Sequence, residues 1–193
     1  EWAVIACDQY TSQPKYWDEV KNTVGDKPSA YNIILPEAYL SDDDSEKINK
    51  INKTMVDYLE SNVFDVYEDT IIFTERTLKD GKKRLGIVGL IDLEDYSYIK
   101  GADTPIRATE ETVIERIPPR VNIRKDALVE LPHIMLLIDD ADCSVIEPLD
   151  VEKANFEIAY DFELMQNAGH ICGYAVSEED KNKINFFRIK AYY

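Results

Sequence analysis

Cysteine, histidine and long apolar runs are scarce in this sequence, and each shortage excludes a class of protein. The 193 residues include 3 Cys and 2 His. Because the cysteines are widely spaced and form no C-x-x-C pair, the pattern predicts neither a disulfide framework nor a zinc knuckle. No stretch approaches the roughly 18 consecutive apolar residues of a membrane-spanning helix, and the start of the chain has no basic segment followed by an apolar one. We therefore expect a cytoplasmic protein with no membrane partner.

Positive charge is also in short supply. Lys and Arg total 22 against 38 Asp and Glu, which gives a net charge of -16 and a pI near 4.5. This average field opposes binding to nucleic acid or to an anionic membrane. A small anionic metabolite is still compatible with it, because a local group of arginines can bind one phosphate on an acidic protein. The expected partner is therefore a small anion and not a nucleic acid.

Apolar residues, by contrast, are plentiful. They make up 45% of the chain, and aromatic residues make up 10%, which is ample for a core. Helix-type and strand-type segments follow one another with no repeat or linker. The sequence predicts an α+β or mixed α/β fold with a single mixed sheet, helices packed on it, and one domain over residues 1–193. Since the chain opens on Glu1 and ends without a helix stop, we expect this domain to be incomplete.

Two amphipathic helices are predicted in the first third of the chain. The first begins at Pro14 and ends before Gly25, with an apolar face that includes Trp17. The second follows the acidic run 42–44, which we expect to favour the helix N-terminus and not to bind metal. Its apolar positions recur every three or four residues as one buried stripe: Ile48, Ile51, Met55, Leu59 and Val63.

Strand-type segments are predicted at several places. Residues 2–7 form a short apolar run that ends just before Asp8. Residues 70–74 and 85–92 flank the turn sequence Lys-Asp-Gly-Lys and predict a hairpin. Residues 134–138 are predicted as a buried internal strand. A turn at Gly169 leads into a last strand-type segment, followed by Ser177 and Asp180 as a capping pair for a final helix.

Prolines interrupt two further helical patterns. Residues 109–116 predict a helical turn, which Pro118 and Pro119 end, so Arg120 is expected on a rigid loop. After Pro148, apolar residues at every fourth position predict another helix: Ala154, Ile158 and Phe162.

The standard catalytic signatures are absent. The sequence has no glycine-rich nucleotide loop, no zinc-hydrolase motif and no serine-hydrolase elbow. A histidine-based site could use only His133 or His170, and isolated histidines are usually structural. His133 is kept as a candidate ligand-binding residue. The acidic residues 139, 140 and 142 are interpreted as a solvated strand end, so no metal site is predicted.

One stretch stands out because it concentrates arginine in an acidic chain. Residues 106–124 contain four arginines and three glutamates in 19 positions. Arginine forks match phosphate or carboxylate geometry, so Arg107, Arg116 and Arg120 are candidate phosphate ligands. Glu110 is a candidate base for a substrate hydroxyl. The alternative is an ion-paired, solvated helix face with a purely structural role.

Several segments resemble a known family. They are residues 6–13, 107–112, 115–121, 131–140 and 160–167, and they are similar to the prokaryotic family called domain of unknown function 1015. Members of that family are longer, so the resemblance implies that this chain is an N-terminal portion. Their later part carries a motif similar to the phosphate loop of ParB and sulfiredoxin-like proteins. By analogy with free serine kinases of that class, the resemblance implies phosphoryl chemistry on serine or phosphoserine.

The resemblance also points to particular residues. Asp8 matches an early acidic position of the family and becomes a candidate catalytic residue. Arg107, Glu110 and Thr112 match an Arg-His-Glu-His-Thr stretch only loosely, because the histidines are absent here. The first hypothesis is a kinase- or phosphatase-like enzyme fragment that handles a phosphorylated small molecule, with Mg²⁺ and a nucleotide as compatible cofactors. The alternative is a non-catalytic ligand-binding or regulatory module.

Overall fold

The chain divides into two compact units. The computed structural model describes residues 10–108, 113–131, 133–183 and 191–192, so the strand predicted at residues 2–7 lies outside the described residues. One unit, called the helical unit here, comprises Glu1–Val66 and Thr112–His133, and the other, the sheet unit, comprises Tyr67–Glu111 and Ile134–Tyr193. The predicted α+β class is confirmed, with the strands divided between two sheets and not gathered in one. That the whole chain forms one domain stays a prediction.

The first helix of the helical unit is α1 (Pro14–Val24), as predicted. Proline is favoured in its first turn because its missing N–H would have no helical partner there. The helix buries Trp17, Val20 and Val24, and Gly25 follows with a φ of 57°. The Trp17 indole donates a hydrogen bond to the Tyr10 carbonyl at 3.0 Å, which ties the helix to the segment before it.

Helix α2 (Ser45–Glu60) follows two short 3-10 helices, Ala30–Ile33 and Glu37–Tyr39. Ile51 and Met55 pack with Ile33 in one buried cluster, and Ile48 is buried too. The predicted stripe is longer than the real one, because Leu59 is exposed and Val63 lies beyond the end of the helix. The apolar face of α2 is therefore confined to its first three turns.

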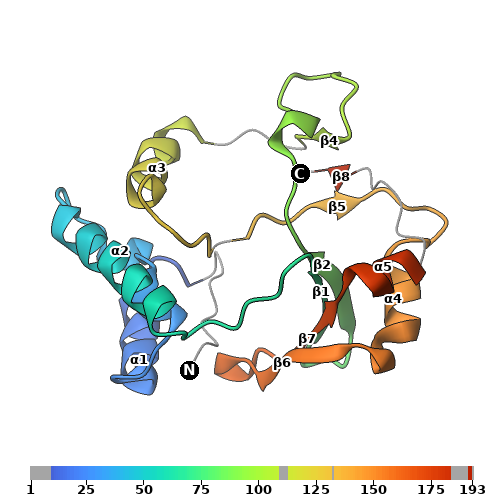
Figure 1. The fold of residues 1–193 in the computed structure, drawn as a ribbon. Helices are drawn as coiled ribbons and strands as arrows, with labels where there is room; N and C mark the ends of the chain where they lie inside the picture. The colour runs from blue at the N-terminus through green and yellow to red at the C-terminus, as the bar shows by residue number, and fades with distance from the viewer. Residues whose placement is uncertain (1–9, 109–112, 132, 184–190, 193) are drawn as a thin grey trace. The chain divides into compact units, whose positions relative to one another are not determined.

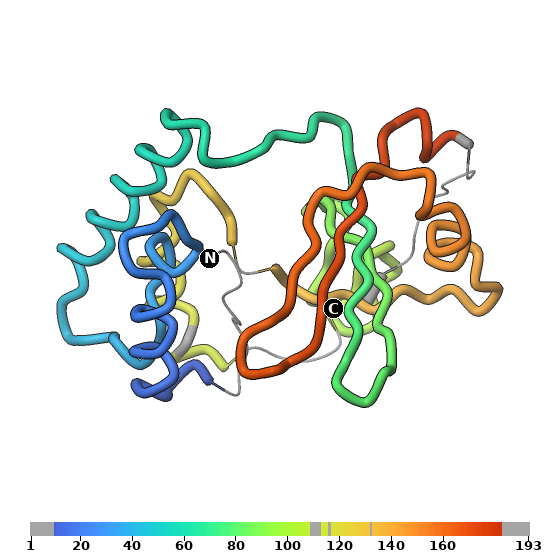
Figure 2. Tube along the Cα trace, turned by 90° about the horizontal axis from the view of Figure 1, so that it is seen from below, coloured from blue at the N-terminus to red at the C-terminus, as the bar shows by residue number. Residues whose placement is uncertain are grey.

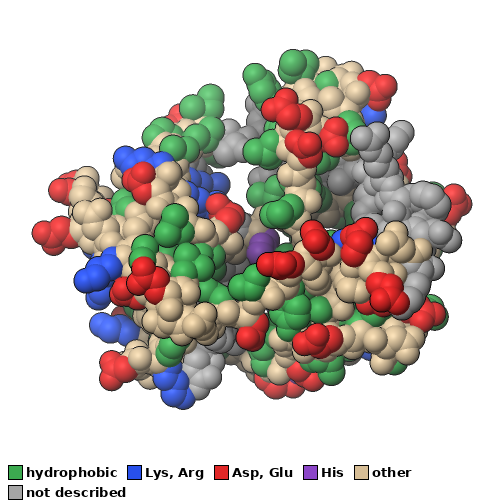
Figure 3. Space-filling model, in the orientation of Figure 1, with side chains coloured by type: hydrophobic (Ala, Val, Ile, Leu, Met, Phe, Trp, Pro, Cys, Tyr) green, Lys and Arg blue, Asp and Glu red, His purple; other side chains and the backbone are tan. Residues whose placement is uncertain are grey.

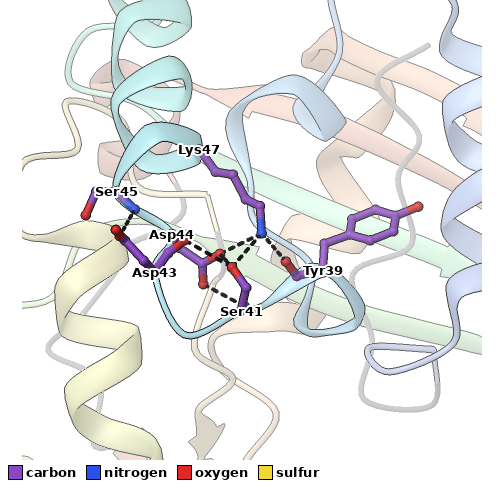
Figure 4. A network of polar contacts seen from close by, with 6 residues as sticks. All are labelled: Tyr39, Ser41, Asp43, Asp44, Ser45 and Lys47. Carbon is purple, nitrogen blue, oxygen red and sulfur yellow. Dashed lines mark hydrogen bonds and ion pairs between the residues drawn. The ribbon is translucent and has the colours of Figure 1, made fainter.

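The acidic run before α2 serves the start of the helix (Figure 4). Asp43 accepts a hydrogen bond from the Ser45 backbone amide at 3.0 Å, and Lys47 donates to Asp44 at 2.7 Å. The hydrogen bond from Lys47, followed by those from Ser41, lowers the pKa of Asp44 despite the opposing effect of burial. The predicted role at the helix N-terminus is confirmed for Asp43, whereas the side chain of the N-cap residue Asp44 makes no capping hydrogen bond and contacts Ser41 and Lys47.

The prediction for Pro118 and Pro119 is wrong. A 3-10 turn, Ile114–Arg116, runs directly into α3 (Ile117–Arg124), and both prolines lie in the first turn of that helix. The first-turn amides of a helix have no partner, so proline costs no hydrogen bond there. Ile117 adopts helical φ and ψ of -68° and -53° although it precedes a proline, a position that disfavours this conformation. Arg120 therefore lies on a helix and not on a loop.

The main sheet of the sheet unit, sheet A, is antiparallel with the strand order β2-β1-β7-β6. Its strands are β1 (Ile71–Thr77), β2 (Lys83–Val88), β6 (Glu157–Glu163) and β7 (His170–Val176). Figures 1 and 2 show the β1–β2 hairpin beside the β6–β7 hairpin. The predicted hairpin around Gly81, whose φ is 80°, and the predicted strand after Gly169 are confirmed.

Sheet A has two faces with different surroundings. The core face carries Phe73 and Val176, which pack with Leu149 and Phe156. Leu149 belongs to α4 (Ile146–Glu152), which continues into the 3-10 turn Lys153–Asn155. Because side chains alternate along a strand, Thr74 and Arg76 lie on the other face, called the arginine face here.

The helix predicted after Pro148 is wrong in its second half. Pro148 lies in the first turn of α4, whereas Ile158 and Phe162 belong to strand β6. A spacing of four residues fits one side of a strand as well as one side of a helix, so the pattern was ambiguous. The register of β6 against β7 shifts between Ile158 and Tyr160, which breaks the alternation a strand prediction would need.

A second sheet, sheet B, is small and mixed. Its order is β3-β4-β8-β5, with β3 and β8 parallel to β4 and β5 antiparallel to β8. The strands are β3 (Tyr96–Ser97), β4 (Ile106–Arg107), β5 (Leu137–Ile138) and β8 (Ala191–Tyr192). The predicted buried strand at residues 134–138 is wrong, because only Leu137–Ile138 pair and Ile134, Met135 and Leu137 are exposed.

The last helix, α5 (Glu178–Lys183), begins as predicted. The Ser177 amide donates to the Asp180 carboxylate at 3.3 Å, and the Asp180 amide donates to the Ser177 hydroxyl oxygen at 3.2 Å. This reciprocal pair is a capping box with aspartate at the third position. Within the part of the chain that the structure describes, no helix has both the length and the apolar character needed to span a membrane.

Candidate functional site

A shallow depression, largely open to solvent, lies along one side of α3 on the surface of the helical unit. The hollow has a volume of about 300 Å³ and is lined by Arg120, Val121, Arg124 and Lys125. We call it the basic hollow. Arg120 and Arg124 are four residues apart, so they lie on the same side of the helix, one turn from each other. The residues from Ile117 to Lys125 include no carboxylate.

Two of the three cations in the basic hollow have no ion-pair partner among the described residues. Arg124 pairs with Glu130, with 3.0 Å between Nη1 and Oε1. Neither Arg120 nor Lys125 has a carboxylate of the described residues within ion-pair distance. In an acidic chain, unpaired cations side by side form a local exception to the average field.

The helix dipole explains the positions of two of the three cations in the basic hollow, but not that of the third. Arg124 and Lys125 lie at the C-terminal end of α3, where a positive charge stabilises the helix dipole. Arg120 lies one turn earlier, where that effect is small. No described residue of α3 is buried, and Val121 is exposed beside the arginines. Arg120 is therefore the cation of the basic hollow whose position the helix dipole does not explain.

Arg107 lies in β4 of the sheet unit, apart in sequence and in unit from the basic hollow. Its Nη2 pairs with Asp103 at 3.0 Å, and its Nε donates to the Thr104 carbonyl at 3.2 Å. These contacts hold the guanidinium against its own loop. A shared site of Arg107 with Arg120 stays a prediction.

The remaining candidates from the sequence are only partly placed. Asp8 and Glu110 lie outside the described residues, and for Arg116 only the backbone, in the turn before α3, is described. His133 is exposed at the end of the helical unit. His170 begins β7, where its Nε2 lies 2.5 Å from the Asp161 carboxylate.

A polar cluster that the sequence did not reveal lies on the core face of sheet A. Glu75, whose side chain is 13% exposed, accepts hydrogen bonds from Lys83 and Lys153. Lys153 also donates to Asp150 at 2.7 Å. Glu75 and Lys153 are 78 residues apart, so no local pattern could have indicated their contact.

The electrostatics of this cluster favour permanent charge over proton exchange. Burial tends to raise the pKa of Glu75, but hydrogen bonds from Lys153 and Lys83 outweigh it, and the pKa is lowered. The hydrogen bonds to Asp150 and Glu75 raise the pKa of Lys153. Both groups therefore remain ionised near neutral pH, which suits a structural link between β1 and the end of α4. It does not suit a general acid or base.

The carboxylates elsewhere in the described part of the chain do not assemble into a metal site. Among the residues that the structure describes, no group of three or more His, Cys, Asp and Glu side chains is arranged to hold a metal ion. The carboxylate of Asp140 instead accepts hydrogen bonds from the Ser144 hydroxyl and the Val145 amide, both at 2.8 Å.

The distribution of charge differs between the surfaces of the two units. On the face drawn in Figure 3, Lys and Arg side chains are visible mainly over the helical unit, and Asp and Glu side chains gather over the sheet unit. The segment after residue 112 contributes Arg116, Arg120, Arg124 and Lys125 against Glu115, Asp126 and Glu130. This segment is thus a locally basic part of an acidic chain.

Fold and site together define an α+β protein with a small cationic hollow on an acidic chain. The family model described as "Protein of unknown function (DUF1015)" matches residues 1–193, and the chain belongs to this family. No curated protein and no solved structure matches the chain.

Proposed function

We propose that this chain binds a small phosphorylated metabolite in the basic hollow, with Arg120 as the principal ligand. The observation that carries the proposal is the exposed Arg120, which has no ion-pair partner among the described residues and lies one turn from Arg124 and close to Lys125. A guanidinium offers two parallel N–H donors that match a phosphate. Lys125 adds a point charge beside that fork.

The size of the site favours a small ligand over a polymer. A volume of about 300 Å³ is at the lower limit of ligand pockets. Arg120 and Lys125, which have no ion-pair partner among the described residues, can neutralise one phosphate, but the net charge of -16 repels a long polyanion. With this function we also propose a cytoplasmic location, where phosphorylated metabolites are abundant.

Binding is better supported than catalysis. The lining of the basic hollow contributes no carboxylate that could act as a base. Phosphoryl transfer on serine or phosphoserine, with Asp8 or Glu110 as the base and Mg²⁺ with a nucleotide, is the extension that the family resemblance suggests. The regulatory or ligand-binding module is the function that the described geometry supports best.

Calorimetric titration with O-phosphoserine, ADP and pyrophosphate tests the proposal, with serine as the ligand that lacks phosphate. Arg120→Gln should weaken the binding of a phosphorylated ligand about tenfold, because a hydrogen bond to a charged group is lost. Arg120→Lys should recover only part of the affinity, since lysine lacks the fork.

A matched pair of lysine variants provides the control. Lys125→Gln lies in the hollow, whereas Lys50→Gln removes the same charge from an exposed position of α2. We expect weaker binding from the first variant and no change from the second. Equal affinities in the wild type, Arg120→Gln and Lys125→Gln would overturn the proposal.

A further inference from the structure

Two arginines stand directly opposite each other on the arginine face of sheet A. Arg76 of β1 pairs in register with Arg84 of β2. Side chains directly opposite each other in an antiparallel pair lie on one face, with their Cβ atoms roughly 5 Å apart. Like charges at such positions destabilise the pairing unless something of opposite charge lies between them.

No described side chain supplies that opposite charge. Neither arginine forms an ion pair with a carboxylate of the described residues. Asp80, in the turn, lies near enough for Arg84 to contribute to its lowered pKa, but the hydrogen bond from Lys82 is the main cause. The Asp80 carboxylate already pairs with Lys82 at 2.8 Å.

Arg76 also has a donor without a partner. Its Nη2 donates to the Ala168 carbonyl at 3.4 Å, which is a long bond. Its Nε is buried and has no hydrogen-bond partner among the described residues. A buried donor left unpaired is costly, so its presence beside a second arginine indicates a ligand or a water at this position.

One further hydroxyl lies on the arginine face near the two arginines. Thr74 lies on the same face one step along β1, between Gly86 of β2 and Gly173 of β7. No side chain extends from Gly86 over the Thr74 hydroxyl, whereas the ring of Tyr160 fills the space above Gly173. Burial raises the pKa of Tyr160 to about 12, so the phenol brings no negative charge to this face.

We infer that Arg76 and Arg84 hold a small oxyanion, such as inorganic phosphate or the phosphate group of a metabolite, on the arginine face. The anion would accept the free Nε–H of Arg76 and the guanidinium donors of Arg84, and the Thr74 hydroxyl is the nearest further donor. One such ligand would remove the like-charge repulsion and satisfy the buried donor together. This subsite belongs to the sheet unit and does not rest on the function proposed for the basic hollow.

Thermal unfolding of the full chain in phosphate and in chloride, at equal ionic strength and pH, tests this inference. For a ligand at about tenfold above its Kd, the wild-type Tm should rise by roughly 3 °C in phosphate, with saturation. In an Arg120→Gln background, which removes binding at the basic hollow, Arg84→Gln should abolish this rise, and Arg76→Lys, which keeps the charge but lacks Nε, should reduce it. Lys79→Gln removes an exposed charge from the same hairpin and should leave the rise intact.

The variants separate a specific site from a general salt effect and from the basic hollow. If phosphate raises the Tm of Arg84→Gln as much as that of Lys79→Gln, the subsite does not exist. An equal Tm of the wild type in phosphate and in chloride would overturn it as well, leaving water as the partner of Nε. Arg120→Gln should lose binding at the basic hollow but keep the response of the arginine face.

Discussion

On the core face of sheet A two lysines share one glutamate, whereas on the arginine face two arginines oppose each other with no described carboxylate at ion-pair distance. The residues responsible, Glu75 and Arg76, are neighbours on the same strand. On the core face, Lys153 from the end of α4 pairs with Glu75. On the arginine face, no described carboxylate pairs with either arginine. The balanced charges link β1 to the end of α4, while the unbalanced pair is the place where we propose an anion.

The largest expected effect comes from filling the space beside the arginine pair. In Gly173→Ala the new Cβ would lie 2.2 Å from Cζ of Tyr160 and would force the ring away. We expect a loss of about 3 kcal/mol in the free energy of unfolding, measured by urea denaturation. Gly89→Ala, whose Cβ would meet Ile71 at an ordinary 3.4 Å, is the control. Equal stabilities of the two variants would show that Tyr160 does not define this face.

A smaller loss is expected on the balanced face. Glu75→Gln leaves the half-buried Lys153 with Asp150 alone, and the free energy of unfolding should fall by about 2 kcal/mol. Arg84→Gln, on the unbalanced face, should change it by less than about 0.5 kcal/mol or raise it slightly in chloride, because repulsion is relieved. Denaturant titration of both proteins measures the contrast. The comparison fails if Arg84→Gln is the more destabilising variant.

Acid should remove the difference between wild type and Glu75→Gln. The pKa of Glu75 is lowered from 4.5 in the folded protein, so its contribution is present above that value and lost as the pH falls through the folded pKa. Protonation of other carboxylates with lowered pKa values, such as Asp44, reduces the free energy of unfolding of both proteins equally. The free energies of unfolding of the two proteins should therefore converge as the pH is lowered from 7 into the acid range. Parallel curves would mean that Glu75 is not stabilised as a carboxylate.

Local signals in the sequence predicted the elements that depend on local contacts. Helix α1 has Pro14 and Gly25 at its ends, α5 has the Ser177 and Asp180 pair, and the β1–β2 hairpin has Gly81 in its turn. The residues that form these helix ends and this turn interact with partners only a few positions away. A short stretch of sequence is therefore enough to predict them. Strand β6 was missed because a spacing of four residues fits both helix and strand.

The candidate site was predictable only in part. The sequence identified Arg120, but taking the two prolines as a helix end hid its one-turn spacing from Arg124. Proline at a helix start would have placed both on one face, so the signal was present and was interpreted wrongly. The opposition of Arg76 and Arg84 depends on the register set by the hairpin turn, and the predicted strands 70–74 and 85–92 stopped short of both residues. The contact of Glu75 with Lys153 depends on tertiary packing and could not be read from one sequence.

The prolines that begin α3 also decide how its arginines are presented. Packing does not hold this helix, because no described residue of it is buried. Pro118 and Pro119 instead restrict the backbone of the unfolded chain, so fewer conformations are lost when the helix forms. A ligand that reaches Arg120 and Arg124 therefore meets a scaffold that is already ordered, and little of its binding energy is spent on ordering the backbone.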